Sequence, residues 1–199
     1  MKRKKYECIF DENNFIDEEY PDYKNKCDFF NRLTQEPYKK FYDNHLFRYL
    51  LKCKIKDQGK LITVILMNPS FADEYGLDST LCNVKEFLEK QKNYSEFEVL
   101  NIFPIRTPNS KNILKLMKKY EKIQKTNNEY IINSLKSADE VLVAWGRKYH
   151  SYAKWIFKYL NNKKVYAYSV NKDGSPTHFA PQVYYNRNKE INFLQEYKI

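Results

Sequence analysis

The segment that most constrains the fold is residues 61–67, a nearly unbroken run of aliphatic residues between a turn signal at 57–60 and the pair Asn68-Pro69. A strand with one solvated face alternates apolar and polar side chains, whereas a strand covered on both faces is apolar throughout. This run therefore predicts a central strand with both faces buried. Such a strand needs a layer of other structure on each side, so we expect an α/β protein.

Strand-like and helix-like segments alternate along the rest of the chain. Strands are predicted at residues 45–55, 97–103, 140–146 and 164–169, and helices at residues 80–92, 112–119, 126–135 and 149–160. Ser79 or Thr80 is predicted to cap the first helix, and the strands at 45–55 and 61–67 are predicted to form a hairpin. The alternation predicts a three-layer α/β/α sandwich around a mostly parallel sheet.

The amino-terminal part of the chain has a different character. Residues 1–42 are polar and aromatic without a clear period, and residues 11–28 are rich in acidic side chains. We expect an irregular arm there that packs on the domain and protects an edge of its sheet. Residues 43–199 are predicted to form a single α/β domain.

The chain is basic, with a formal net charge of +10. That charge is compatible with an anionic partner such as a nucleotide, a nucleic acid or a membrane surface. A lysine-rich proteome would give the same charge without any such partner. No apolar run approaches the roughly 20 residues that cross a bilayer, and no apolar signal segment follows the basic start. We therefore expect no membrane partner and a soluble, cytoplasmic protein with reduced thiols.

The cysteines and the absent motifs exclude several classes of protein. Cys8, Cys27, Cys53 and Cys82 are scattered and lack the spacing of a zinc site. Neither a metal nor another cofactor is expected. The glycine-rich phosphate and dinucleotide loops, the zinc-protease motif and the hydrolase nucleophile elbow do not occur, which argues against those enzyme classes.

Ligands of open α/β sheets bind outside the carboxyl ends of the strands, and polar residues follow the predicted central strand. Pro69 ends the strand, so Asn68 is presented at its tip, where its amide can orient a water molecule or bind the edge of a base. Ser70 is a supporting residue, and Asp73 or Asp78 is a candidate acid, base or ribose contact. The alternative is ordinary turn chemistry, because turns use the same residues.

A second candidate segment follows the strand at 97–103. Asn101 and Phe103 lie at the strand end, and Arg106 lies between two prolines that stiffen its loop. An arginine in that position suits a phosphate or a carboxylate, which it can bind through two hydrogen bonds. The alternative is an arginine that braces the loop through backbone carbonyls.

A third candidate segment is Trp145-Gly146-Arg147, at the end of the strand at 140–146 and before a helix. Gly146 permits a close backbone approach, the helix amino terminus favours anions, and Arg147 adds positive charge. The alternative is a strand-to-helix turn that needs glycine for its geometry alone.

His178 is the histidine that follows the last predicted strand, in a loop at the same edge of the sheet. A histidine there can donate a hydrogen bond or transfer a proton near neutral pH. His45 and His150 open a strand and a helix, and both have the pattern of structural residues. The alternative for His178 is an ordinary surface residue.

These segments in this order resemble an uncharacterised bacterial and phage family called domain of unknown function 1643. The resemblance rests on Phe47-Arg48-Tyr49, residues 66–70 with Ala72-Asp73 and Asp78-Ser79-Thr80, Asn101-Ile102-Phe103 with Arg106, Asn127-Asn128, Ala144-Trp145-Gly146, and the loop 172–174 leading to Pro176 and His178. It covers about residues 45–181 and leaves the amino-terminal arm outside.

The same layout is similar, more distantly, to the uracil-DNA glycosylase superfamily. In that superfamily a motif that reads Gly-x-Asn-Pro-Gly in some branches follows a central strand, and residues 66–70 take its place here. The resemblance implies that Asn68 positions the attacking water and that His178 hydrogen-bonds the leaving base. Leu66 and Ser70 stand where the motif has glycines.

The resemblance implies a protein that acts on a nucleobase or nucleotide, with the fold of the glycosylases. The enzymatic hypothesis is a hydrolase that cleaves the N-glycosidic bond of modified or damaged bases, with Phe71 or Phe103 stacking on the base. The alternative is a non-catalytic module that binds a nucleotide, a nucleic acid or a phage or host protein, which the missing glycines favour. A third hypothesis is a basic scaffold whose strand-end residues only make turns.

Overall fold

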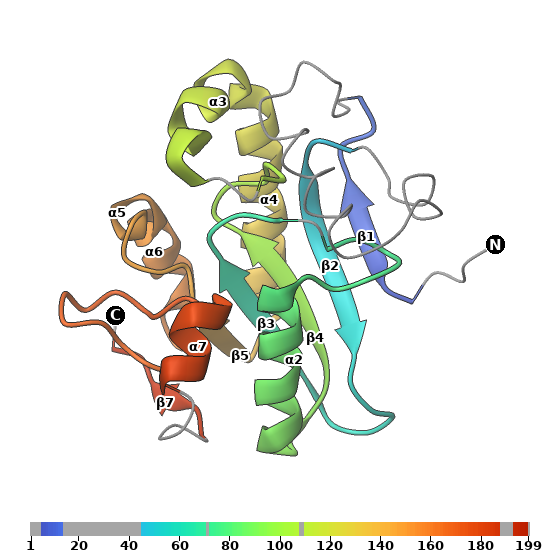
Figure 1. Ribbon diagram of the computed structural model, residues 1–199, viewed down its shortest axis with the longest axis vertical. Helices are drawn as coiled ribbons and strands as arrows, with labels where there is room; N and C mark the ends of the chain where they lie inside the picture. The colour runs from blue at the N-terminus through green and yellow to red at the C-terminus, as the bar shows by residue number, and fades with distance from the viewer. Residues whose placement is uncertain (1–4, 14–44, 71, 108–109, 188–192, 199) are drawn as a thin grey trace.

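The computed structural model describes residues 5–13, 45–70, 72–107, 110–187 and 193–198. Within these ranges the chain forms one seven-stranded sheet in the order β1-β2-β4-β3-β5-β6-β7 (Figure 1). The strands are β1 (Glu7–Phe10), β2 (Arg48–Lys54), β3 (Lys60–Leu66), β4 (Tyr94–Asn101), β5 (Glu140–Val143), β6 (Lys164–Ala167) and β7 (Gln195–Glu196).

The sheet is mostly parallel, as the sequence predicts. Strands β4, β3, β5 and β6 are parallel neighbours, with β3 at the centre. Strand β2 runs antiparallel to β4 and β1 antiparallel to β2, so β1 points the same way as β4. Strand β7 runs antiparallel to β6 at the other edge. The apolar run at 61–67 is indeed central, and residues 62–66 of β3 are buried.

The predicted hairpin between β2 and β3 is wrong, because β4 lies between them. The connection at residues 55–59 is a turn, but it wraps around the start of β4. Ile55 and Lys56 donate backbone hydrogen bonds to the Ser95 carbonyl, and the Lys60 amide donates to the Asn93 carbonyl. The local sequence encodes a turn correctly, but it does not encode which strand will come to lie beside it.

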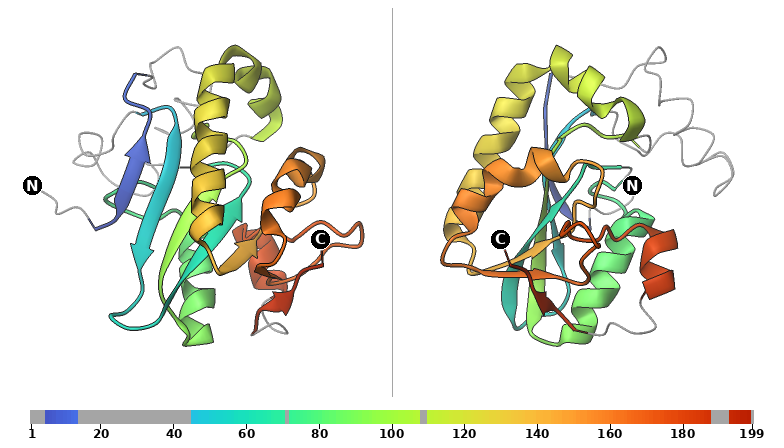
Figure 2. Two further views of the ribbon diagram at one scale, coloured as in Figure 1. Left: turned by 180° about the vertical axis from the view of Figure 1, so that it is seen from behind. Right: turned by 90° about the vertical axis from the view of Figure 1, so that its left-hand side faces the viewer.

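Helices cover both faces of the sheet (Figure 2). The helical elements are α2 (Ser79–Gln91), η2 (Ser110–Asn112), α3 (Ile113–Lys119), α4 (Glu121–Ser137), α5 (His150–Ala153), η3 (Lys154–Ile156), α6 (Phe157–Leu160) and α7 (Pro181–Arg187). One apolar core joins the sheet to α3, α4 and the α5–α6 segment, and a second joins the opposite face to α2 and α7. These two cores make the molecule a three-layer α/β/α sandwich.

Several local predictions need correction. The predicted helix at 149–160 is broken into α5, η3 and α6. Asp78, rather than Ser79 or Thr80, caps α2, because its carboxylate accepts the Leu81 amide hydrogen bond. Helix α7 was not predicted.

The amino-terminal arm was predicted to be irregular, but its described part includes the edge strand β1. Asp11, just after β1, accepts a hydrogen bond from the Tyr49 hydroxyl at 2.9 Å. Most of the predicted arm, residues 14–42, lies outside the described residues. Among the helices of the described chain, none is long and apolar enough to cross a membrane.

Candidate functional site

A pocket of about 270 Å³ opens at the carboxyl ends of β3 and β4, the edge where the strand order predicts a ligand. It is enclosed by the loop after β3, the start of α2 and the loop that carries His178. Its lining consists of Arg48, Leu66, Met67, Asn68, Pro69, Ser70, Asp78, Thr80, Leu81, Asn101, Thr107, Ser110, His178 and Ala180. The structure therefore brings together six of the residues proposed from the sequence: Asn68, Pro69, Ser70, Asp78, Asn101 and His178.

Asn101, the last residue of β4, is the most unusual member of this lining. Its side chain is completely buried, yet within the described part of the chain neither Oδ1 nor Nδ2 has a hydrogen-bond partner. Its backbone is firmly held, because the Asn127 side chain donates to its carbonyl at 2.9 Å. A buried amide without partners is costly in the folded state. Asn101 thus offers one acceptor and two donors to whatever enters the pocket.

Asn68 has a different environment, although it lines the same pocket. Its Nδ2 donates to the Pro69 carbonyl at 2.7 Å and to the Thr107 carbonyl at 2.8 Å. The bond to Thr107 ties the loop after β3 to the loop after β4. The Thr107 amide strengthens this link, because it donates a hydrogen bond to the Pro69 carbonyl. Asn68 therefore joins two loops through its donors and keeps its Oδ1 as an acceptor.

His178 presents a single donor. Its Nδ1 accepts the Ala180 backbone amide at 3.0 Å, so the proton of the neutral ring lies on Nε2. Burial lowers the pKa of His178 to about 4, against the opposing effect of the Asp78 carboxylate, and the ring is neutral near pH 7. The loop is anchored because the Tyr168 hydroxyl donates to the His178 carbonyl at 2.8 Å.

Two charged residues of the lining, Arg48 and Asp78, both bind the backbone of Ala72. Arg48 on β2 is 1% exposed and donates to the Ala72 carbonyl at 2.7 Å. Asp78 accepts the Leu81 amide and, at 3.4 Å, the Ala72 amide. A strand arginine gives no sequence signal of a site, but its place in the Phe47-Arg48-Tyr49 motif did distinguish it.

Three predicted residues of the loops after β3 and β4 lie outside this lining. Asp73 is buried, and its Oδ1 accepts the backbone amides of Tyr75 and Gly76, which shapes the turn before α2. Arg106 donates from Nη1 to the His45 carbonyl at 3.0 Å and lies over the Phe10 ring, an arrangement that braces the sheet edge. Phe103 packs edge-on against Tyr149. Phe71 lies outside the described residues.

The turn after β5 packs against the loop that carries His178. Gly146 adopts φ +78°, and a Cβ there would lie 3.2 Å from the His178 Cβ, so glycine lets this turn pack against the histidine. Trp145 is buried and donates from Nε1 to His150 Nδ1. Arg147 Nε donates to Asp173 Oδ2 at 2.7 Å.

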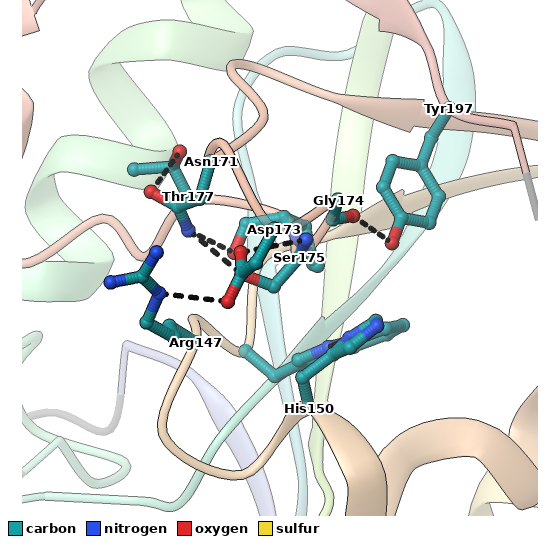
Figure 3. A network of polar contacts seen from close by, with 10 residues as sticks. Arg147, His150, Asn171, Asp173, Gly174, Ser175, Thr177 and Tyr197 are labelled. Carbon is teal, nitrogen blue, oxygen red and sulfur yellow. Dashed lines mark hydrogen bonds and ion pairs between the residues drawn. The ribbon is translucent and has the colours of Figure 1, made fainter.

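The Asp173 carboxylate organises the loop that precedes His178 (Figure 3). Its Oδ1 accepts the Ser175 hydroxyl at 2.7 Å. This hydrogen bond, together with Arg147, lowers the pKa of Asp173 to about 2. Tyr197 adds a hydrogen bond from its hydroxyl to the Gly174 carbonyl. Trp145, Gly146 and Arg147 thus touch the loop and its anchors without lining the pocket.

The described residues hold no cluster of three or more His, Cys, Asp or Glu side chains that could bind a metal ion. The donors that line the pocket are amides, hydroxyls, one guanidinium and one imidazole, with Asp78 as the single carboxylate of the described lining. That set suits a polar organic ligand with both donors and acceptors.

Fold and pocket together define an α/β protein with a polar pocket at the ends of its central strands. The chain belongs to the family described as protein of unknown function (DUF1643), whose model matches residues 48–179, more than half of the chain. The match begins at Arg48 in the pocket and ends one residue after His178. Neither a curated protein nor a solved structure matches the chain.

Proposed function

We propose that this protein binds a nucleobase in the pocket at the ends of β3 and β4, and that it hydrolyses the N-glycosidic bond of modified or damaged bases. The observation that carries the proposal is the buried amide of Asn101, which has no hydrogen-bond partner among the described residues. Resemblance to the uracil-DNA glycosylase superfamily is part of this proposal, at the level of Asn68, His178 and their order in the chain.

The polar groups match one class of ligand. The edge of a nucleobase carries neighbouring donors and acceptors, and an asparagine amide pairs with such an edge through two hydrogen bonds. The neutral His178 ring adds a donor from Nε2. A cavity of about 270 Å³ lies just below the roughly 300–1,000 Å³ of sites for drug-sized ligands, and it suits a single base better than a dinucleotide.

The proposed chemistry divides between two residues. A water molecule held by Asn68 Oδ1 attacks the anomeric carbon as the bond from that carbon to the base nitrogen breaks. The base leaves with the bonding electrons as an anion, the water oxygen becomes the sugar hydroxyl, and the proton that the water loses passes through solvent to the base. The Nε2–H of His178 hydrogen-bonds the charge that develops on the base. Removal of a base from a strand requires that the base be turned out of the stack.

A non-catalytic nucleotide- or nucleic-acid-binding module is the second candidate. Asp78 is the single carboxylate of the described lining, and both of its oxygens already accept backbone amides. Among the described lining residues, no carboxylate is therefore available as a general base. A binder would use Asn101 and His178 in the same way and would release no product.

The test is a strand-cleavage assay with labelled single- and double-stranded DNA that carries uracil, other damaged bases or phage-type modified bases. After alkali treatment, we expect strand breaks with the wild-type protein and none with Asn101→Leu. Asn133→Leu, which changes an exposed asparagine of α4 that does not line the pocket, is the control and should still cleave.

Two results separate the candidates. A base-dependent thermal shift that disappears in Asn101→Leu, without strand breaks, would establish the binding module. Cleavage or binding that is unchanged in Asn101→Leu would refute the proposed site.

A further inference from the structure

A second hollow, of about 610 Å³, lies between α3, α4 and α5. Its lining consists of Phe103, Leu114, Lys115, Met117, Lys118, Glu121, Gln124, Lys125 and Tyr152. We call it the α3–α5 groove. Three lysines face one glutamate in this lining, and the floor is apolar and aromatic.

We propose that the α3–α5 groove binds the single-stranded nucleic acid that flanks a base held in the pocket. The inference rests on the proposed function, because a base in the pocket of a strand-directed protein arrives with its neighbours attached. Single strands are bound by cationic grooves that follow the phosphates and by aromatic rings that stack on the bases.

The groove and the pocket share a wall. Ser110 lines the pocket, and its carbonyl accepts hydrogen bonds from Lys148 Nζ at 2.8 Å and from the Tyr149 hydroxyl. On its other side, the Tyr149 ring contacts the rings of Phe103 and Tyr152, which line the groove. Tyr149 thus contacts one residue of the pocket lining and two of the groove lining, so the two hollows lie on either side of it.

The charges of the groove are available to a ligand. Lys115, Lys118 and Lys125 are exposed and make no hydrogen bond or ion pair with any described residue. Free lysines around a groove are complementary to phosphates. The net charge of the chain, +10, reinforces the attraction at long range.

Two further side chains have unused binding capacity. Tyr152 is 46% exposed, although Tyr149 and Phe103 fix its ring from one side. Gln124 donates from Nε2 to the Ile102 carbonyl and to Asn128, which leaves its buried Oε1 without a partner among the described residues. A fixed, exposed ring and a free acceptor in one groove suit a base better than they suit a bare phosphate.

The test measures the binding of a labelled oligothymidylate by fluorescence anisotropy at salt concentrations from about 50 to about 200 mM. Each phosphate contact to a single strand contributes about 0.7 to the slope of log affinity against log salt. Replacement of Lys115, Lys118 and Lys125 by glutamine should reduce that slope by about two. Tyr152→Leu should weaken binding by about 5- to 150-fold, and Tyr152→Phe should not.

The matched control replaces Lys92, Lys136 and Lys164 by glutamine, which removes the same charge near the opposite ends of the strands. Its slope should stay close to that of the wild-type protein. The proposal would be overturned if the slope fell equally in both triple variants, or if the wild-type protein bound no single-stranded DNA or RNA. Binding of an acidic peptide in the groove in place of the oligonucleotide would overturn it too.

The pocket proposal and the groove proposal can be refuted independently of each other. The pocket is tested by Asn101→Leu with base-containing ligands, and the groove is tested with an unmodified oligonucleotide and lysines that do not touch the pocket. Loss of the salt-dependent binding in the groove variant, with an unchanged thermal shift by a free base, would assign strand binding to the groove alone.

Discussion

At the scale of single residues, the amide of Asn101 is the feature that the fold itself does not explain. A leucine would fill the same buried position without leaving polar atoms unpaired. The folded state is therefore less stable than the same backbone could be, as is common where a binding site is maintained at the expense of stability.

Asn101→Leu should stabilise the ligand-free protein by about 1–3 kcal/mol, because the penalty of the unpaired amide disappears. Urea unfolding monitored by circular dichroism measures the change. Asn127→Leu should have the opposite effect, since the Asn127 side chain donates to the carbonyls of Asn101 and Ile102. A destabilised Asn101→Leu protein would show that the amide has a structural role.

His178 makes stability depend on pH. Its pKa falls from 6.5 to about 4 on folding, so the unfolded chain binds more protons between these values. The neutral ring therefore contributes at most about 3 kcal/mol to the free energy of unfolding. This contribution is complete above pH 6.5 and is lost as the pH falls toward 4. Urea unfolding at several pH values should show a smaller acid loss in His178→Asn than in the wild-type protein. Equal losses would mean that His178 titrates normally.

The residues of the pocket could be grouped from sequence only in part. Asn68 and Ser70 follow β3, Asn101 ends β4 and His178 follows β6, and the strand-end rule gathers these three strand ends at one edge. The rule does not specify which way a side chain points after the strand ends. For that reason Arg106 was expected beside them, whereas it braces β1 and β2 through the His45 carbonyl.

At the scale of elements, the turn between β2 and β3 depends on one glycine. Gly59 has φ +146°, and a Cβ there would lie 2.7 Å from the Ser95 nitrogen, against the backbone of β4. The position therefore excludes other residues by both conformation and space.

Gly59→Ala should destabilise the protein by at least about 1–3 kcal/mol, because the backbone must shift or adopt a strained conformation. Gly76→Ala is the matched control, since a Cβ at Gly76 meets nothing within 4 Å. Thermal unfolding of both variants compares them directly. Similar melting temperatures for the two would contradict the close approach of the turn to β4.

Elements with a strong hydrophobic pattern were predictable. Strand β3 was identified from its apolar run, and α2 from Val84, Phe87 and Leu88, which are all buried. The short strands β1 and β7 have no pattern of their own, because edge strands of four and two residues are defined by their partners. Their partners lie far away in sequence, and no local signal specifies them.

At the scale of the whole molecule, the carboxyl-terminal segment closes the sheet and supports the pocket. The Tyr197 amide donates to the Val165 carbonyl at 2.8 Å, its hydroxyl donates to the Gly174 carbonyl, and its ring packs edge-on against Trp145. The end of the chain thus holds the loop that leads to His178.

Tyr197→Phe should lower the free energy of unfolding by about 0.5–1.5 kcal/mol, the usual contribution of one hydrogen bond. Tyr197→Ala should lower it by about 3–5 kcal/mol, because the buried ring is removed as well. Hydrogen exchange should be faster at the Gly174 amide, which donates to the Asn171 carbonyl. Unchanged exchange in Tyr197→Ala would show that the loop is ordered without the terminus.

The position of β4 between β2 and β3 has a consequence for biosynthesis. During translation β2 and β3 are synthesised before β4, the strand that lies between them in the folded sheet. Their sequence favours direct pairing with each other, the hairpin that local rules predict. Native assembly requires that this early pairing be avoided or undone when residues 94–101 emerge, so we expect a nascent chain ending near Gln91 to be the stage most vulnerable to misfolding and aggregation.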